Sequence, residues 1–205
     1  MNRFATFTLA AACACTMYGQ GGGGGRGGGG PVTIASNLKQ SYNQIKNNIT
    51  MAADQMPESG YGFMPEGEPR SFAGWVGHVA DVQANQCGGL AGTPLTLGAG
   101  AMTTKADLVA ALKKSFDACD TVFNALTDEN AMEPFTGGRG GPQPKAVAAY
   151  GMIIHSNECY GAMAVYMRLQ KLTPPSSAGR GGGGGRGGGG GKGGPGGPGG
   201  GAPKQ

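Results

Sequence analysis

Two histidines and a cysteine are the residues of this chain whose type and spacing suggest chemistry. The chain has two histidines, His78 and His155, and Cys159 follows the second by four residues. Residues i and i+4 of a helix share one face, so His155 and Cys159 can reach a single point. A facing helix that carries His78 would complete a set of two imidazoles and one thiolate. Three such ligands with an open fourth position are typical of catalytic zinc, and imidazole also suits nickel, iron and copper.

A second interpretation of these residues needs no metal. A lone histidine on a helix is usually a surface or hydrogen-bonded core residue, and a free cysteine usually packs as a small hydrophobe. Glu158 could act as a base beside the candidate ligands, but at 100° per residue it lies off the face that His155 and Cys159 share. The spacing alone leaves both interpretations open.

The other cysteines raise the question of a disulfide. Of the five cysteines, Cys13 and Cys15 lie near the N-terminus, and Cys87, Cys119 and Cys159 form an odd set. A Cys87–Cys119 disulfide would leave Cys159 free for metal, but it requires Cα atoms within about 7 Å. Two buried free thiols are the alternative.

Periodic apolar residues predict the elements that must position these side chains. Spacings of three and four residues indicate amphipathic helices over 36–56, 71–90, 104–126 and 144–172. Ser36, Ser71 and Thr104 are the expected N-caps. The stripe of the first helix is predicted to comprise Ile34, Leu38, Tyr42, Ile45, Ile49, Ala52 and Met56. No strand is expected.

The connections favour a four-helix bundle. Residues 58–70 are predicted to be a loop, and residues 129–143 break the helical pattern. Residues 92–102 are rich in Gly, Thr and Pro, and no secondary structure is expected there. A loop of that length can cross a bundle, which would make the second and third helices parallel.

Glycine and charge separate a helical domain from two tails. The chain has 44 glycines in 205 residues, and 28 of them lie in 19–30 and 179–201. All 12 acidic residues lie in 31–178 with ten basic ones, so the domain is slightly acidic and the tails and leader carry the basic excess. The tails contain few arginines and no aromatic residue, so we expect disordered tethers over 21–31 and 178–205 and no nucleic-acid binding.

The first 20 residues resemble a secretory leader. Arg3 precedes an apolar run, and Ala12-Cys13-Ala14 fits a small-residue cleavage pattern. We therefore expect a signal peptide over 1–20 and a periplasmic or secreted protein, with lipoprotein anchoring as a variant. No other segment is apolar enough to span a bilayer.

Three motifs resemble those of the DinB-like proteins. Met56-Pro57 followed by Tyr61, Phe63 and Pro65 is similar to their "MPxxxYxFxP" junction. His78-Val79-Ala80 is similar to their "H-hydrophobic-A" helix. The end of the domain is similar to "HxxxHYGxxxxYxRxxxxxPP", over residues 155–175. The resemblance extends over about residues 34–177.

The resemblance implies an all-α, down-up-up-down four-helix bundle over 32–177 and a divalent metal held by three histidines. His78 and His155 match the first two ligands, whereas Cys159 stands where the family usually has histidine. A thiolate there would favour zinc, with nickel or iron as alternatives, but the site could also be degenerate and empty, or Cys159 could be oxidised. Some relatives transfer small thiols or hydrolyse small substrates. Two functions remain open: an enzyme with a small-molecule substrate, and a non-enzymatic binding or envelope protein. A homodimer is also left open.

Overall fold

The computed structural model describes residues 31–136 and 141–178. The expected leader over 1–20 lies outside the described residues. So do all of the expected linker and tail except Pro31 and Ala178. The domain boundaries at 32 and 177 therefore stay predictions. Everything below concerns the described part of the helical unit that begins at Thr33.

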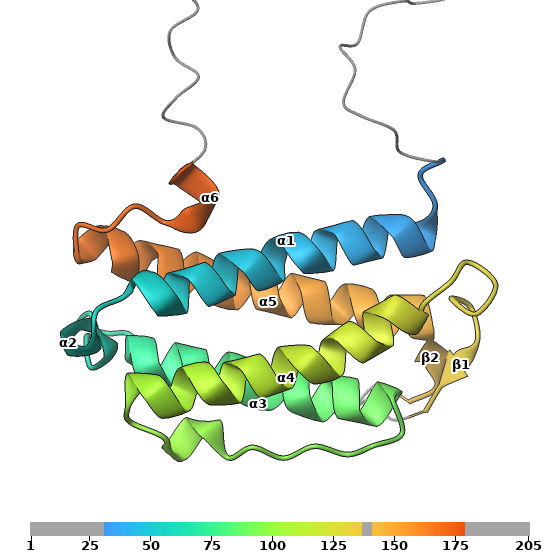
Figure 1. The fold of residues 1–205 in the computed structure, drawn as a ribbon, viewed down its shortest axis with the longest axis horizontal. Helices are drawn as coiled ribbons and strands as arrows, with labels where there is room; N and C mark the ends of the chain where they lie inside the picture. The colour runs from blue at the N-terminus through green and yellow to red at the C-terminus, as the bar shows by residue number, and fades with distance from the viewer. Residues whose placement is uncertain (1–30, 137–140, 179–205) are drawn as a thin grey trace, which may run out of the picture. The chain divides into compact units, whose positions relative to one another are not determined.

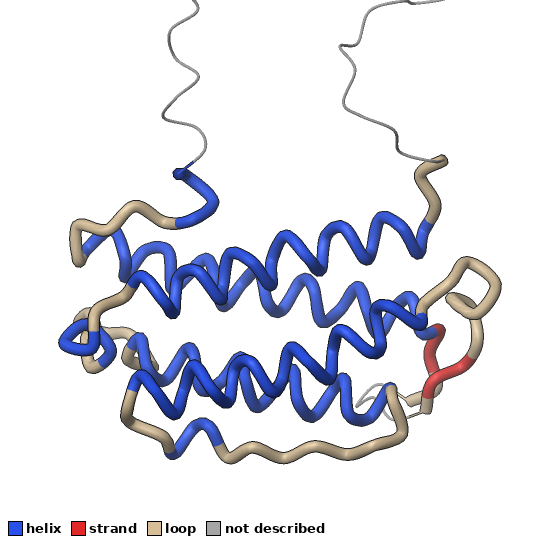
Figure 2. Tube along the Cα trace, in the orientation of Figure 1, coloured by secondary structure: helices blue, strands red, loops and turns tan. Residues whose placement is uncertain are grey.

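Four long helices form the bundle that the sequence predicts (Figures 1 and 2). They are α1 (Ile34–Gln55), α3 (Phe72–Leu90), α4 (Lys105–Ala125) and α5 (Lys145–Leu169). Around the bundle, α1 contacts α4 and α5, and α3 contacts the same two helices. Helices α3 and α4 run in one direction and α1 and α5 in the other, which is the down-up-up-down arrangement (Figure 1). The predicted fold class, an all-α four-helix bundle, is confirmed.

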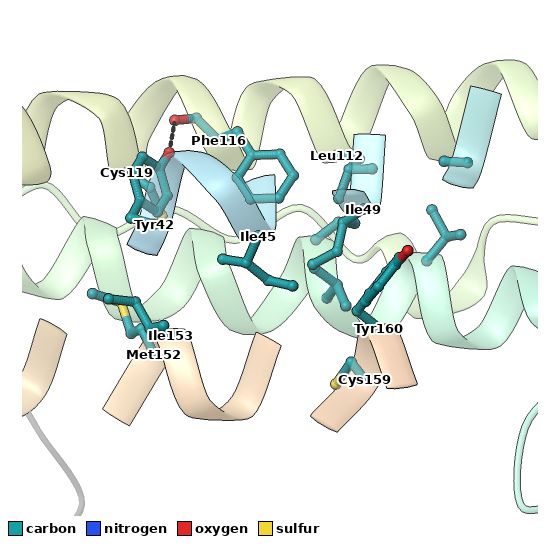
Figure 3. Close-up of a cluster of buried hydrophobic side chains, with 14 of the residues drawn as sticks. Tyr42, Ile45, Ile49, Leu112, Phe116, Cys119, Met152, Ile153, Cys159 and Tyr160 are labelled. Carbon is teal, nitrogen blue, oxygen red and sulfur yellow. Dashed lines mark hydrogen bonds between the residues drawn. The ribbon is translucent and has the colours of Figure 1, made fainter. Parts of the chain in front are cut away.

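The core lies between the four helices and is built mainly from the predicted stripes. Tyr42, Ile45 and Ile49 of α1 pack with Leu112 and Phe116 of α4, and all five are at most 2% exposed (Figure 3). Ile34 was expected in the same stripe but is 58% exposed, because it is the first residue of α1 and lies at the open end of the bundle.

Two predicted helix ends were wrong. Helix α1 starts at Ile34, and its N-cap is Thr33 rather than Ser36. Thr33 Oγ1 accepts from the Ser36 backbone N–H, and Ser36 Oγ accepts from the Thr33 N–H, so the two form a capping box. Helix α5 ends at Leu169 instead of 172, because Lys171 takes a positive φ of 60° and the Leu172 N–H returns to the Met167 carbonyl.

Short elements occupy three stretches that were predicted to be irregular. The 58–70 loop contains the one-turn helix α2 (Glu58–Tyr61), and a helical turn α6 (Pro175–Ala178) follows the Pro174 stop. Strands β1 (Pro134–Phe135) and β2 (Gln143–Pro144) form an antiparallel pair. Two residues per strand are too few to show alternation, so the sequence carries no signal for them.

The crossover between α3 and α4 is ordered and lies along α3 (Figure 1). It includes the 3₁₀ turn η1 (Ala99–Ala101), where no secondary structure was expected. Two glycines of α3 allow the contact. A Cβ on Gly77 would lie 2.6 Å from the Ala99 carbonyl oxygen, and one on Gly88 would lie 2.7 Å from the Thr93 carbonyl oxygen.

Asp81 fixes the crossover between these two glycine contacts. Its Oδ1 accepts from the Ala99 N–H and its Oδ2 from the Gly100 N–H, both at 2.8 Å. One carboxylate therefore satisfies two backbone N–H groups at the start of η1, where a helical turn leaves its first donors without an internal partner.

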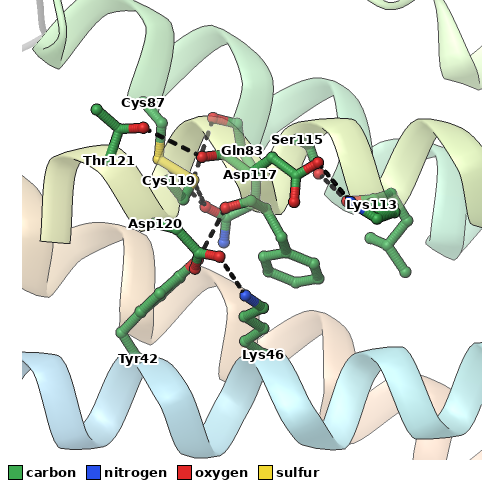
Figure 4. A network of polar contacts seen from close by, with 12 residues as sticks. Tyr42, Lys46, Gln83, Cys87, Lys113, Ser115, Asp117, Cys119, Asp120 and Thr121 are labelled. Carbon is green, nitrogen blue, oxygen red and sulfur yellow. Dashed lines mark hydrogen bonds and ion pairs between the residues drawn. A yellow bond between two sulfur atoms is a disulfide. The ribbon is translucent and has the colours of Figure 1, made fainter. Parts of the chain in front are cut away.

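A partly buried polar cluster joins α1 and α3 to α4 (Figure 4). Tyr42 Oη donates to Asp120 at 2.7 Å, and Lys46 Nζ lies 2.5 Å from the other oxygen of Asp120. Nearby, the Sγ atoms of Cys87 on α3 and Cys119 on α4 are 1.96 Å apart, and their Cα atoms are 5.0 Å apart. This placement has the geometry of a disulfide and sets the two parallel helices in register.

Within residues 31–136 and 141–178, no helix combines the length and the apolar character that a membrane crossing requires.

Replacing Asp81 with alanine should loosen the crossover. Because the backbone amides of Ala99 and Gly100 would lose a charged acceptor, we expect Asp81→Ala to lower the free energy of unfolding by about 1.5–3 kcal/mol. Amide exchange of Ala99 and Gly100 should accelerate. The matched control is Asp117→Ala, which removes an exposed ion pair to Lys113 and should cost less than about 0.5 kcal/mol. Equal losses in both variants would contradict the anchoring role.

Candidate metal centre

The structure brings the three predicted ligands together. His78 comes from the middle of α3, and His155 and Cys159 come from consecutive turns of α5, which packs against α3. The ligand atoms of all three side chains lie within 4.8 Å of one another. We call these three residues the triad.

The separations between the triad's donor atoms resemble those of a tetrahedral zinc site. His78 Nε2 and His155 Nε2 are 3.2 Å apart, and Cys159 Sγ is 3.6 Å from His155 Nε2. Zinc bonds of about 2.0–2.1 Å to nitrogen and 2.3 Å to sulfur, at tetrahedral angles, would separate two nitrogens by about 3.3 Å and a nitrogen from a sulfur by about 3.6 Å. These two separations therefore fit a zinc ion, and the third, between His78 and Cys159, is within 4.8 Å.

His78 is held in a state that suits a metal ligand. Its ring meets the Trp75 ring edge-on, with the centroids 6.2 Å apart, and packs against His155 on the other side. Burial lowers the pKa of His78, and the nearby charge of Arg70 lowers it further. The neutral imidazole, which is the form that binds metals, is thus favoured.

Cys159 is the most enclosed member of the triad. It is 1% exposed and packs in the hydrophobic core beside Tyr160 (Figure 3). Burial raises the pKa of its thiol to about 11, although Arg70 acts in the opposite direction. Without a metal the thiol is therefore protonated at neutral pH.

Glu158 lies off the ligand face, as the helical geometry predicts. Its side chain is 72% exposed, and its Oε2 is 3.8 Å from His155 Nδ1, the nitrogen that points away from the triad. This is beyond hydrogen-bond distance. Glu158 is therefore poorly placed to act as a base on a group bound at the triad.

A cleft of about 830 Å³ opens beside His78 and His155. Its walls are α3, α5, the crossover and the β1–β2 pair. Its polar lining consists of Asp81, Asn85, Gln86, Thr96 and Gln143, and apolar residues such as Leu90, Leu97, Phe135 and Val147 line the rest. This volume lies within the usual range for pockets that bind small molecules.

Sequence reasoning missed most of the residues that form this cleft. Residues 95–98 of the crossover are irregular, as expected, but they were not expected to form one wall of the cleft. The signal that could have located it is the pair Gly77 and Gly88, eleven residues or about three helical turns apart on α3. Such spacing marks a helix face that another segment approaches closely.

The sequence comparisons agree with this architecture. The DinB superfamily model matches residues 42–161, more than half of the chain. A solved structure described as a DinB-like protein from Bacillus cereus ATCC 10987 is similar with a TM-score of 0.52 and 18% identity, covering 67% of this chain and 93% of that chain. A search of the curated proteins gives no match.

The fold defines a class of protein, the down-up-up-down four-helix bundles, and His78 of α3 faces the i, i+4 pair His155 and Cys159 of α5 within it. The match over 42–161 makes the assignment specific: the chain belongs to the DinB superfamily. The predicted resemblance is confirmed. At 18% identity the solved structure shows the shared fold alone.

Oxidation of Cys87 and Cys119 is a prediction that peptide mapping can test. Digestion without reductant should yield a peptide pair linked through these two residues. Because a cross-link restricts the unfolded chain, the variant with both cysteines replaced by serine should lose about 2–4 kcal/mol of unfolding free energy. Reductant should destabilise the wild type and leave the variant unchanged. Freely alkylated Cys87 and Cys119 in the protein purified without reductant would refute the bond.

Proposed function

We propose that this protein binds a divalent metal ion, zinc in preference to nickel or iron, through His78, His155 and Cys159. The observation that carries the proposal is the 3.2 Å and 3.6 Å spacing of the imidazole and thiol donors. DinB-like proteins are often metal-binding, which supports the same assignment.

Cys159 is the reason for the preference for zinc. The family pattern has a third histidine at this position, and a thiolate is a softer and negatively charged ligand. Imidazole and thiolate are both ligands of catalytic zinc sites. The cost is that the buried thiol must lose its proton on binding, so metal binding has to supply that free energy.

The cleft supports a small-molecule ligand or substrate. It ends at His78 and His155, so a molecule lying in it would reach the triad. A bound zinc ion would act there as a Lewis acid that stabilises a thiolate or lowers the pKa of a water. The residues of this chain would orient the molecule: Asn85 and Gln143 offer amide hydrogen bonds, and the leucines and Phe135 exclude water. We assign the reaction class to thiol transfer or hydrolysis, by analogy with relatives.

A non-enzymatic binding protein is the second candidate. The burial of Cys159 at 1% exposure and its pKa of about 11 favour it, because a thiol that stays protonated packs as an ordinary core residue. In that case the two histidines would bond to each other through their Nε2 atoms.

Export to the periplasm or the exterior is part of the proposal. It rests on the leader-like residues 1–20 and on the placement of Cys87 and Cys119, because disulfides persist in oxidising compartments.

Metal binding can be measured by calorimetric titration of the chelator-treated protein with zinc. We expect one zinc per chain for the wild type. His78→Ala and Cys159→Ala should each weaken binding by about tenfold or more, because each removes one of three ligands. Cys159→His restores the ligand type of the family and should retain binding.

The matched control is Glu158→Gln, which alters an exposed neighbour of the ligands and should leave the affinity unchanged. Cobalt provides a second readout: Cys159→His should lose the sulfur-to-cobalt absorption band while still binding the ion. Absence of uptake by the wild type, or equal uptake by His78→Ala, would reject the proposal in favour of the non-enzymatic protein.

A further inference from the structure

Arg70 contacts Tyr166 and Trp75 beside the triad. Its carbonyl oxygen accepts a hydrogen bond of 2.8 Å from Tyr166 Oη on α5. Its guanidinium lies 5.0 Å from the centre of the Trp75 ring. Its stem passes so close to the first turn of α3 that a Cβ on Gly74 would lie 3.2 Å from Arg70 Cβ. An arginine held in this way has lost much of its conformational freedom before any ligand binds.

The guanidinium of Arg70 nevertheless has no acidic partner. Across the described stretches 31–136 and 141–178, no carboxylate lies within 4.0 Å of it. Glu68, two residues away, is exposed, and its Oε2 is 3.4 Å from the Tyr166 hydroxyl. The side-chain N–H groups of this half-buried cation are therefore available to an anion.

Arg70 lies beside the His78 side of the triad. Its guanidinium is 5.0 Å from the centre of the Trp75 ring, and the centre of the same ring is 6.2 Å from the centre of the His78 ring. Two carboxylates also lie near the triad: Asp81 accepts from the η1 amides, and Glu158 is 72% exposed.

The triad lies between Arg70 and the cleft. The α3 residues that line the cleft are His78 and residues after it, and those of α5 are His155 and residues before it. Arg70 and Trp75 precede His78 in the chain and therefore lie on the side of the triad that faces away from the cleft. A molecule that fills the cleft and extends to the triad therefore brings its end group toward Arg70.

We propose that Arg70 binds the carboxylate of a small, singly charged ligand whose body occupies the cleft. This inference rests on the proposed metal site and adds the chemical class of its ligand. A carboxylate suits the site better than a phosphate dianion, because Arg70 is a single planar fork and the cleft lining includes no lysine or arginine. The apolar lining suits an uncharged body.

The test is calorimetric titration of the zinc-loaded protein with benzoate and with benzamide, its neutral counterpart. The wild type should bind benzoate more tightly than benzamide. Arg70→Gln should weaken benzoate binding by about tenfold or more, as expected for a lost charge-assisted hydrogen bond, and leave benzamide unchanged. The affinity of Arg70→Lys for benzoate should lie between those of the wild type and Arg70→Gln. Arg168→Gln is the control, because Arg168 is exposed and contacts Ala164 and Ser177.

Several results would overturn the inference: equal binding of benzoate and benzamide by the wild type, no loss in Arg70→Gln, or tighter binding of inorganic phosphate than of benzoate. Thermal melting of Arg70→Gln shows whether the variant is folded. If the wild type takes up no zinc, the metal proposal fails by itself, and the same titrations on metal-free protein decide the role of Arg70. A preference for benzoate that depends on Arg70 would then support the role of Arg70 in carboxylate binding. The absence of such a preference would reject that role.

Discussion

The close packing of α3 is the constraint on which the rest of the structure depends. This helix contacts α4, α5 and the crossover, and two of its positions, Gly77 and Gly88, have no room for a side chain beyond hydrogen. Because the crossover must lie against these glycines, α4 begins at the same end of the bundle as α3 and runs parallel to it. The parallel direction in turn places Cys87 beside Cys119 and leaves the other side of α3 for α5. The face that α3 turns toward α5 is the one that carries His78.

This packing divides the candidate site into two parts that differ in their exposure to solvent. Two histidines meet on the partly exposed side of the α3–α5 contact, where the cleft opens, whereas Cys159 lies inside the core. Burial lowers the pKa of His78, which favours its neutral imidazole, but the thiol of Cys159 is shielded and protonated without a metal. Replacing the family's histidine with a cysteine therefore changes the charge of the ligand set and also the free energy needed to form it. Arg70, held on Trp75, adds a positive charge next to this half-buried set.

The sequence predicts the parts of the fold that depend on local periodicity. The stripe of α1, the N-caps Ser71 and Thr104, and the meeting of His78 with the i, i+4 pair on α5 all follow from helical spacing and polar caps. The ordered crossover, the Asp81 anchor and the β1–β2 pair do not, because they depend on contacts between distant segments and are too short for a periodic signal. Arg70 was missed for the same reason: its placement depends on Tyr166, 96 residues away.

X-ray absorption at the zinc edge of the protein purified without chelator tests the central claim most directly. We predict a first shell that contains nitrogen at about 2.0–2.1 Å and one sulfur at about 2.3 Å, with imidazole scattering beyond it. In the Cys159→Ala variant the sulfur contribution should disappear. A wild-type spectrum without sulfur, or a protein that retains no zinc, would contradict the assignment of His78, His155 and Cys159 as a metal centre.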